Sequence, residues 1–138
     1  MACWFITGCS TGIGREIASA ALEAGHSVAV TARNTGSVAD FADRFGDRAL
    51  VLPLDVTNHE QITAAVAAAE AAFGGIDVLV NNAGYGYMAA VEEGDDAEVR
   101  KLFDTNYFGV VDTLKAVLPD MRARRRGHVI NISSMTGL

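Results

Sequence analysis

Residues 7–14 read TGCSTGIG, and they join a short apolar run to a segment with helical periodicity. Gly8, Gly12 and Gly14 let the backbone turn sharply and let a bulky anion approach without a Cβ in the way. The first turn of a helix exposes unpaired N–H groups and a partial positive charge, which attract phosphate. We therefore predict a strand, a glycine turn and a helix whose N-terminus binds a diphosphate. A tight structural turn without a ligand is the alternative interpretation.

Short apolar runs and longer amphipathic segments alternate along the whole chain. The apolar runs predict strands at residues 3–7, 27–32, 49–54, 76–81 and 128–133. Segments with helical periodicity lie at residues 13–22, 38–45, 57–73 and 96–125. We expect Thr57 and Glu60 to form a capping box at the start of the third helix, and Pro119 to kink or tighten the end of the fourth. The alternation predicts a doubly wound α/β domain with a parallel sheet over residues 1–138.

The composition fits a folded domain and argues against several classes of partner. Half of the 138 residues are hydrophobic, a fifth are charged, and the formal net charge is −6. An acidic chain lacks the basic surface that nucleic-acid binding requires, and we assign the arginines of residues 122–126 to a helix end, where cations complement the dipole. No apolar run approaches the roughly 20 residues that cross a bilayer, and the cysteines and histidines lack metal-site spacing. We expect a cytoplasmic protein with no metal, nucleic-acid or membrane partner.

The end of the second predicted strand bears on the choice of nucleotide. Folds that bind NAD carry an acidic residue about 20 positions beyond the glycines, where it bonds the ribose hydroxyls. No Asp or Glu lies between residues 24 and 39, and Arg33 stands in the sequence VTARN at 30–34. A guanidinium suits the 2′-phosphate of NADP by charge and by geometry. We therefore predict NADP in preference to NAD, with an exposed arginine at a strand end as the alternative.

Five short motifs follow one another along the chain in a fixed order. They are TGCSTGIG at 7–14, LDV at 54–56, NNAG at 81–84, TNYFG at 105–109 and NISS at 131–134, the last followed by Gly137. In this order and spacing the chain closely resembles the short-chain dehydrogenase/reductase family. The resemblance covers the whole chain. It implies a Rossmann-like fold and an oxidoreductase that transfers a hydride between a nicotinamide cofactor and a ketone or secondary alcohol.

The resemblance also implies a cofactor site. Arg33 matches the basic position of the NADP-preferring members, whereas a second basic position common in those members is Thr11 here. Asp55 would accept a hydrogen bond from the adenine amine, although it could also serve as a turn residue before the following helix. Asn81 and Asn82 are expected to bridge backbone groups of neighbouring strands. The residues implied around the cofactor are Gly8, Ser10, Thr11, Gly12, Ile13, Gly14, Arg33, Asp55, Val56, Asn82, Ala83 and Gly84.

The catalytic residues of the family are only partly matched. Asn106 matches the asparagine that bends a helix and holds a water in the proton relay, with a plain surface asparagine as the alternative. Ser134 matches the serine that hydrogen-bonds the substrate carbonyl. The family's proton donor belongs to a Tyr-x-x-x-Lys pair beyond that serine, and this sequence contains no such pair. We therefore expect the N-terminal part of a longer single-domain enzyme that is inactive alone.

Other functions and the state of assembly stay open at this level. A non-catalytic nucleotide-binding module or a truncated relative would also lack the Tyr-x-x-x-Lys pair. A flavin-binding α/β protein places its cofactor at strand ends as well, but it gives NNAG and NISS no role. Members of the family commonly pair through the fourth helix and the next one, and Leu102, Tyr107 and Phe108 widen the apolar stripe of the fourth predicted helix. A homo-oligomer, dimer or tetramer, acting on a small carbonyl or alcohol substrate is therefore expected.

Overall fold

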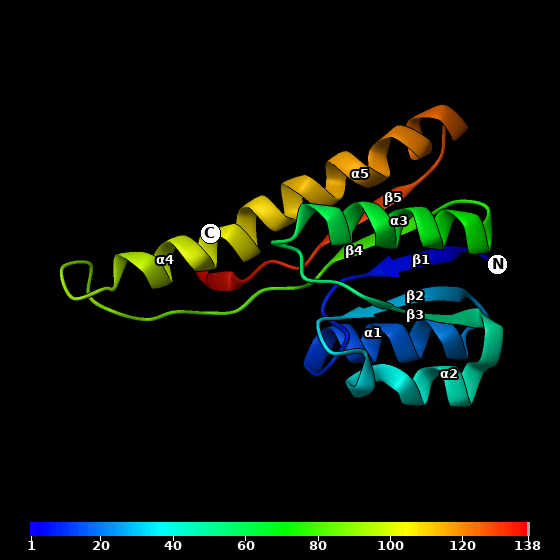
Figure 1. Cartoon of the computed structure of the whole chain (residues 1–138), viewed down its shortest axis with the longest axis horizontal. Coiled ribbons are helices and arrows are strands. Elements are labelled where there is room, and N and C mark those ends of the chain that lie inside the picture. The colour runs from blue at the N-terminus through cyan, green and yellow to red at the C-terminus, as the bar shows by residue number, and fades with distance from the viewer. Residues whose placement is uncertain (138) are drawn as a thin grey trace.

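The computed structural model of the chain describes residues 1–137, which form a sheet of five strands between two layers of helices (Figure 1). The strands are β1 (Cys3–Ile6), β2 (Ser27–Ala32), β3 (Ala49–Pro53), β4 (Val78–Asn81) and β5 (His128–Asn131). The α-helices are α1 (Gly12–Glu23), α2 (Ala39–Phe45), α3 (His59–Phe73), α4 (Asp96–Phe103) and α5 (Gly109–Arg124). Short 3₁₀ turns are η1 (Thr35–Val38), η2 (Gly46–Arg48) and η4 (Met135–Gly137), and η3 (Asp104–Phe108) is π-helical.

All strands of this sheet run parallel, in the order β3-β2-β1-β4-β5. In the central strand β1, Phe5 pairs with Ala29 of β2 on one side and with Leu79 of β4 on the other. The chain moves outward through β2 and β3 and then returns to the other side of β1. The prediction of a doubly wound parallel sheet is confirmed, and the point where the strand order reverses lies between β1 and β4. Such sheets bind ligands outside the carboxyl ends of the strands at that point.

Each face of the sheet packs against its own pair of helices, because consecutive strand residues point to opposite faces. Phe5 belongs to a buried cluster with Ile62 of α3 and residues of α5. The next residue, Ile6, belongs to a separate cluster with Leu22 of α1 and Phe41 of α2. Figure 1 shows this arrangement, with α3 and α5 above the sheet and α1 and α2 below it. Burial of strands on both faces explains why their sequences are almost continuously apolar.

The fourth predicted helix is divided, and the division does not lie at the proline. Pro119 lies inside α5, which continues past it to Arg124. The departure from α-helical hydrogen bonding lies instead at η3, between α4 and α5. A π-helical segment widens the turn by one residue and is common at functional sites. The irregular segment therefore contains Asn106, as the match to the family's helix-bending asparagine implied, and does not contain Pro119.

The start of α3 also differs from the prediction. The N-cap residue is Asn58, whose Oδ1 accepts a hydrogen bond from the Gln61 N–H at 3.1 Å. The hydroxyl of Thr57 donates to Asp55 Oδ1 at 2.7 Å and does not reach the helix. The predicted capping box of Thr57 and Glu60 is therefore wrong at both positions, because the residue three places after the cap is Gln61, whose Oε1 accepts from the Asp55 N–H at 2.8 Å. The change matters for the site, because the Thr57 hydroxyl is then available to donate a hydrogen bond to Asp55.

Candidate cofactor and catalytic site

The glycine turn between β1 and α1 leaves the N-terminus of α1 without a side-chain cap. Gly8 and Gly12 have φ angles of 70° and 62°, in the region that favours glycine. Thr11 is the N-cap residue, and its side chain makes no capping hydrogen bond. The Cβ that Gly12 lacks would point into open space. The N–H groups of the first turn and the positive end of the helix dipole therefore suit a phosphate group at this position.

Asn82, which follows β4, ties the glycine turn to the neighbouring strand. Its Nδ2 donates to the carbonyl oxygens of Thr7 and Gly8, at 3.1 and 3.0 Å. The hydroxyl oxygen of Thr7 in turn accepts hydrogen bonds from the backbone N–H groups of Asn82 and Ala83, both at 2.9 Å. The structure therefore contains the backbone bridge that the sequence led us to expect from Asn82.

Asn81 forms a different contact from the one expected. Its side chain is buried, and its Nδ2 donates to the side-chain oxygen of Asn131 on β5 at 2.8 Å. The Asn81 carbonyl accepts from the Ile132 N–H at 3.0 Å. Asn81 thus joins β4 to β5 through a side-chain pair and does not bridge backbone groups.

Two glycines of the site allow close approaches within the protein. A Cβ at Gly14 would collide with the carbonyl oxygen of Gly8 and with Nδ2 of Asn82. A Cβ at Gly84 would lie 3.1 Å from Oδ1 of Asn106. Gly14 therefore lets the start of α1 pack against the glycine turn. The neighbour that needs the space at Gly84 in this structure is Asn106.

Arg33 and Asp55 follow β2 and β3 at the carboxyl edge of the sheet. Asp55 Oδ1 accepts from the N–H and the hydroxyl of Thr57, at 2.9 and 2.7 Å. The hydroxyl bond is the main cause of a lowered pKa at Asp55; partial burial opposes it, while the N–H bond and the charge of Arg33 assist it. Arg33 is exposed and forms no hydrogen bond or ion pair within residues 1–137. The positive charge of Arg33 therefore contributes to keeping the carboxylate of Asp55 ionised.

The other residues assigned to the cofactor line the same edge. Val56 is buried, and a Cβ on Gly109 at the start of α5 would lie 2.7 Å from it. Ile13 is 61% exposed, although it follows Gly12 directly in the first turn of α1. The Ser10 hydroxyl lies 3.1 Å from the hydroxyl of Ser37 in η1. A single exposed isoleucine is ordinary on a protein surface, so the assignment of Ile13 to the cofactor stays a prediction.

The two residues matched to the catalytic set have different surroundings. Asn106 lies in η3, where its Nδ2 donates to the Tyr85 carbonyl at 2.8 Å and its Oδ1 accepts from the Tyr85 N–H at 3.1 Å. Ser134 follows β5 and is exposed, with its Oγ 2.9 Å from the Thr136 hydroxyl. No hydrogen bond joins Asn106 to Ser134 in the part of the chain described. The structure fixes the amide of Asn106 and leaves the hydroxyl of Ser134 accessible.

None of the tyrosines reproduces the missing proton donor. Tyr85, Tyr87 and Tyr107 are not followed by a lysine four positions later. The hydroxyl oxygen of Tyr87 accepts the N–H of Asp95 at 3.0 Å, and the ring of Tyr107 packs edge-on against Phe108. The three side chains therefore have other contacts or lie exposed on the surface.

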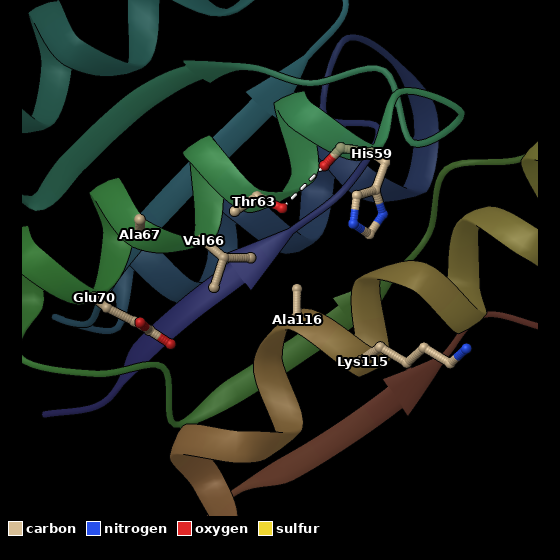
Figure 2. Close-up of a pocket in the computed structure, with 7 residues that line it drawn as sticks. All are labelled: His59, Thr63, Val66, Ala67, Glu70, Lys115 and Ala116. Carbon is tan, nitrogen blue, oxygen red and sulfur yellow. Dashed lines mark hydrogen bonds between the residues drawn. The ribbon is translucent and has the colours of Figure 1, made fainter.

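A surface groove of about 330 Å³ lies between α3 and α5 (Figure 2). Figure 2 shows Ala116 of α5 directed toward α3, and His59 and Glu70 at opposite ends of the α3 side. A second hollow, of about 500 Å³, lies over the face of α4 and η3 that carries Phe103 and Phe108. Neither hollow is lined by a residue assigned to the cofactor or to catalysis.

Two kinds of site were also sought throughout the described residues. No group of three or more histidine, cysteine or acidic side chains in residues 1–137 is arranged to hold a metal ion. No helix within the same residues has both the length and the apolar character needed to span a bilayer.

Comparison with known proteins gives consistent matches along the chain. The family model described as short chain dehydrogenase matches residues 2–138. Oxidoreductase BOA17 of Botryotinia fuckeliana is 44% identical over 135 residues, which cover 97% of this chain and 49% of that protein. A short-chain dehydrogenase from Streptomyces avermitilis has a TM-score of 0.95 at 44% identity, over 99% of this chain and 51% of that one. A gluconate 5-dehydrogenase from Burkholderia cenocepacia, solved with NADP and tartrate, has a TM-score of 0.88 at 37% identity, over 96% and 53% of the two chains.

Proposed function

The chain belongs to the short-chain dehydrogenase family, and from this premise we propose that it forms the cofactor-binding part of an enzyme that transfers a hydride between NADP(H) and a ketone or secondary alcohol. The observation that supports this most directly is the N-terminus of α1, which has no side-chain cap. The glycine turn that leads into it is held by the hydrogen bonds between Thr7 and Asn82. The chain spans about half the length of the relatives it matches. The activity, substrate and partners of the whole protein are therefore parts of the proposal.

The described residues fit the cofactor at three points. The first turn of α1 offers N–H groups to the pyrophosphate. The ionised Asp55 would accept a hydrogen bond from the adenine amine, with the backbone of Val56 beside it. The free guanidinium of Arg33 would bind the 2′-phosphate that distinguishes NADP from NAD. A relative solved with NADP is consistent with this choice.

In the proposed reaction the cofactor and the protein have different roles. Bound NADPH supplies the hydride that reduces the carbonyl carbon. The Ser134 hydroxyl would donate a hydrogen bond to the carbonyl oxygen, where negative charge develops. Asn106 would hold the backbone of Tyr85, and with it the turn that lines the cofactor, and would bind a water in the proton relay. The proton donor itself is proposed to lie in the remainder of a longer protein.

The surface of α4 and η3 supports a proposal of self-association. Val99, Phe103, Tyr107 and Phe108 are between 37% and 56% exposed. Exposed apolar residues grouped on one surface often mark an interface. We propose that the whole protein forms a dimer or a tetramer through this surface. We also propose that it acts in the cytoplasm.

A nucleotide-binding module without catalysis is the second candidate. Such a module needs no Tyr-x-x-x-Lys pair. In that case the chain would bind NADP through the same residues, and Ser134 would have no role in a proton transfer.

Titration of the full-length natural protein with NADPH, NADH and FMN tests the proposal. We expect NADPH to bind at least about tenfold more tightly than NADH, since a bidentate phosphate contact is worth about 1.5–3 kcal/mol. Replacement of Arg33 by Ala should abolish most of this difference. Binding of FMN alone would refute the proposal, and tight binding of NADPH without reduction of any ketone would favour the second candidate. A screen of carbonyl substrates completes the test.

A further inference from the structure

We propose that Arg15 and Ser37 are positioning residues, which hold η1 against the glycine turn and thereby set the preference for NADP over NAD. This inference rests on the proposed function, because it assumes that Arg33 binds the 2′-phosphate. Neither residue belongs to a motif that the sequence singled out. Their importance becomes visible only from contacts between segments more than 20 residues apart.

Arg15, in the first turn of α1, joins this helix to the segment after β2 by three contacts. Its guanidinium donates to the carbonyl oxygen of Ser37 at 3.1 Å. It also forms an ion pair with Asp40 of α2. Its Cζ lies 4.7 Å from the centre of the Phe41 ring, where a cation is attracted to the ring face. The three contacts fix η1 and the start of α2 relative to the helix that would hold the pyrophosphate.

Ser37 forms a second link, this time to the glycine turn itself. Its Oγ lies 2.6 Å from the carbonyl oxygen of Asn34 and 3.1 Å from the hydroxyl of Ser10. A hydroxyl has one proton to donate. Ser37 is the donor in both contacts, so its proton is shared between them, and the shorter bond to the carbonyl oxygen of Asn34 is the stronger one. Asn34 is further held by its own Oδ1, which accepts from the Gly36 N–H at 3.0 Å.

These contacts bear directly on Arg33, which has no partner of its own within residues 1–137. Its backbone lies between β2, which is paired on both sides, and a turn that Ser37 and Arg15 fasten to α1. A side chain that starts from a fixed backbone loses less freedom when it binds a phosphate. The 2′-phosphate is present in NADP and absent from NAD. Loosening of η1 should therefore weaken binding of NADPH and leave binding of NADH almost unchanged.

Arg44 provides a matched control on the adjacent surface. Like Arg15 it links α1 to α2, through an ion pair with Glu23 at 3.6 Å, and its Cζ lies 4.9 Å from the centre of the Phe45 ring. Unlike Arg15 it does not contact η1 or the glycine turn. A general loss of packing between the two helices would affect both variants, whereas a loss of positioning would affect only Arg15.

The experiment compares dissociation constants of NADPH and NADH for the full-length protein and its Arg15→Ala, Arg15→Lys, Ser37→Ala, Arg44→Ala and Arg33→Ala variants. We expect Arg15→Ala to weaken NADPH about tenfold and Ser37→Ala about threefold, in line with loss of one charged and one neutral hydrogen bond, with NADH changed less than about twofold. Arg15→Lys, which keeps the charge for Asp40, should recover part of the loss. Arg44→Ala should leave the ratio of the two constants unchanged.

The outcomes separate this inference from the proposal beneath it. If Arg33→Ala lowers the NADPH preference while Arg15→Ala and Ser37→Ala do not, positioning by Arg15 and Ser37 is wrong and the proposed function stands. If Arg33→Ala leaves the preference unchanged, the assignment to NADP fails. Equal weakening of both nucleotides by Arg15→Ala also overturns the inference. If the Arg15→Ala variant does not fold, the same comparison of NADPH and NADH binding is made with the Arg15→Lys and Ser37→Ala variants.

Discussion

The side-chain amide of Asn106 pairs with the backbone of Tyr85 through both of its polar atoms, at 2.8 and 3.1 Å. This amide donates to the carbonyl and accepts from the N–H of one residue. It takes the place of the backbone groups that a neighbouring strand would offer to Tyr85. It therefore fixes the backbone that follows β4 after regular pairing has ended. The π-helical segment η3 places Asn106 in reach of this backbone, and Gly84 leaves the space for it.

Replacement of Asn106 by Ala should release this segment. We expect faster hydrogen exchange at the Tyr85 amide and a loss of about 1 kcal/mol in the free energy of unfolding, the usual worth of a net hydrogen bond at an exposed site. Under the proposed function, we also expect a lower kcat for this variant of the full-length protein. Unchanged exchange at Tyr85 would show that the amide pair is not what holds this segment.

Alanine substitutions at three glycines should separate packing from ligand binding. Gly14→Ala adds a Cβ against Gly8 and Asn82, so we expect a loss of about 2–4 kcal/mol in the free energy of unfolding. Gly12→Ala meets no neighbour but requires a φ of 62°, so it should cost only about 1–2 kcal/mol while blocking the diphosphate. Gly25→Ala, with a φ of 92° and open space at the far end of α1, is the control for strain. Denaturant unfolding and NADPH titration measure the two effects.

Cofactor binding by Gly12→Ala that equals binding by Gly25→Ala would contradict the placement of the diphosphate. A Gly14→Ala protein as stable as the control would show that the start of α1 can shift away from the glycine turn.

Asp77 should make stability depend on acidity, because it joins three segments at the amino edge of the sheet. Its carboxylate accepts from the Cys3 N–H at 2.9 Å and from the guanidinium groups of Arg124 and Arg126 at 3.0 and 2.7 Å. Partial burial alone would raise the pKa of Asp77, but these bonds outweigh it and lower the pKa to about 2. The folded protein therefore binds this proton less readily than the unfolded chain, whose aspartates titrate near about 4.

The stabilisation by Asp77 is consequently complete above about pH 5 and is lost as the pH falls from about 4 to about 2. Replacement by Asn should cost about 2 kcal/mol in the free energy of unfolding at neutral pH and almost nothing near pH 2. Denaturant unfolding of both proteins across this range measures the difference. A constant difference at every pH would mean that the charge of Asp77 contributes nothing.

Cys9 should be chemically inert in the folded protein. Its thiol is fully buried in the glycine turn and donates to the Ile6 carbonyl at 3.3 Å. Burial raises the pKa of Cys9 to about 12, against smaller opposing effects of the Thr31 backbone and Arg15. Since the thiolate is the reactive form and burial disfavours it, alkylation should proceed at the rate at which the turn opens. Mass-spectrometric labelling checks this, and rapid labelling of Cys9 under native conditions would contradict the structure of the turn.

The sequence predicts the sheet better than it predicts the connections. Strand positions, the parallel arrangement and the glycine turn before α1 depend on local apolar runs and glycine spacing, which are visible in the sequence itself. The cap of α3 depends on whether Thr57 or Asn58 has extended backbone angles, and both residue types suit that position. The irregular segment between α4 and α5 contains Asn106, as the match to the family's helix-bending asparagine implied, but its partner Tyr85 lies 21 positions away and is not indicated by any motif.

The candidate site shows the same limit. Motifs identified Arg33, Asp55, Asn82 and Asn106 as individual residues. The bond from Thr57 to Asp55, and the bond from Arg15 to the Ser37 carbonyl, join residues that no motif relates. The basic residues at 122–126 were assigned to a helix end, and Arg124 does lie in the last turn of α5, but it also pairs with Asp77. Which side chains pair in this way depends on which residues are neighbours in the folded structure, and the spacing of residues along the sequence does not indicate it.

The bonds between Thr7 and Asn82 connect residues 75 positions apart, which directly follow the first and the fourth strand to be synthesised. A growing polypeptide can align its first three strands early, but the segment after β1 cannot be locked in place before Asn82 has emerged. A nascent chain that ends before Asn82 therefore lacks the hydrogen bonds that hold the glycine turn in place.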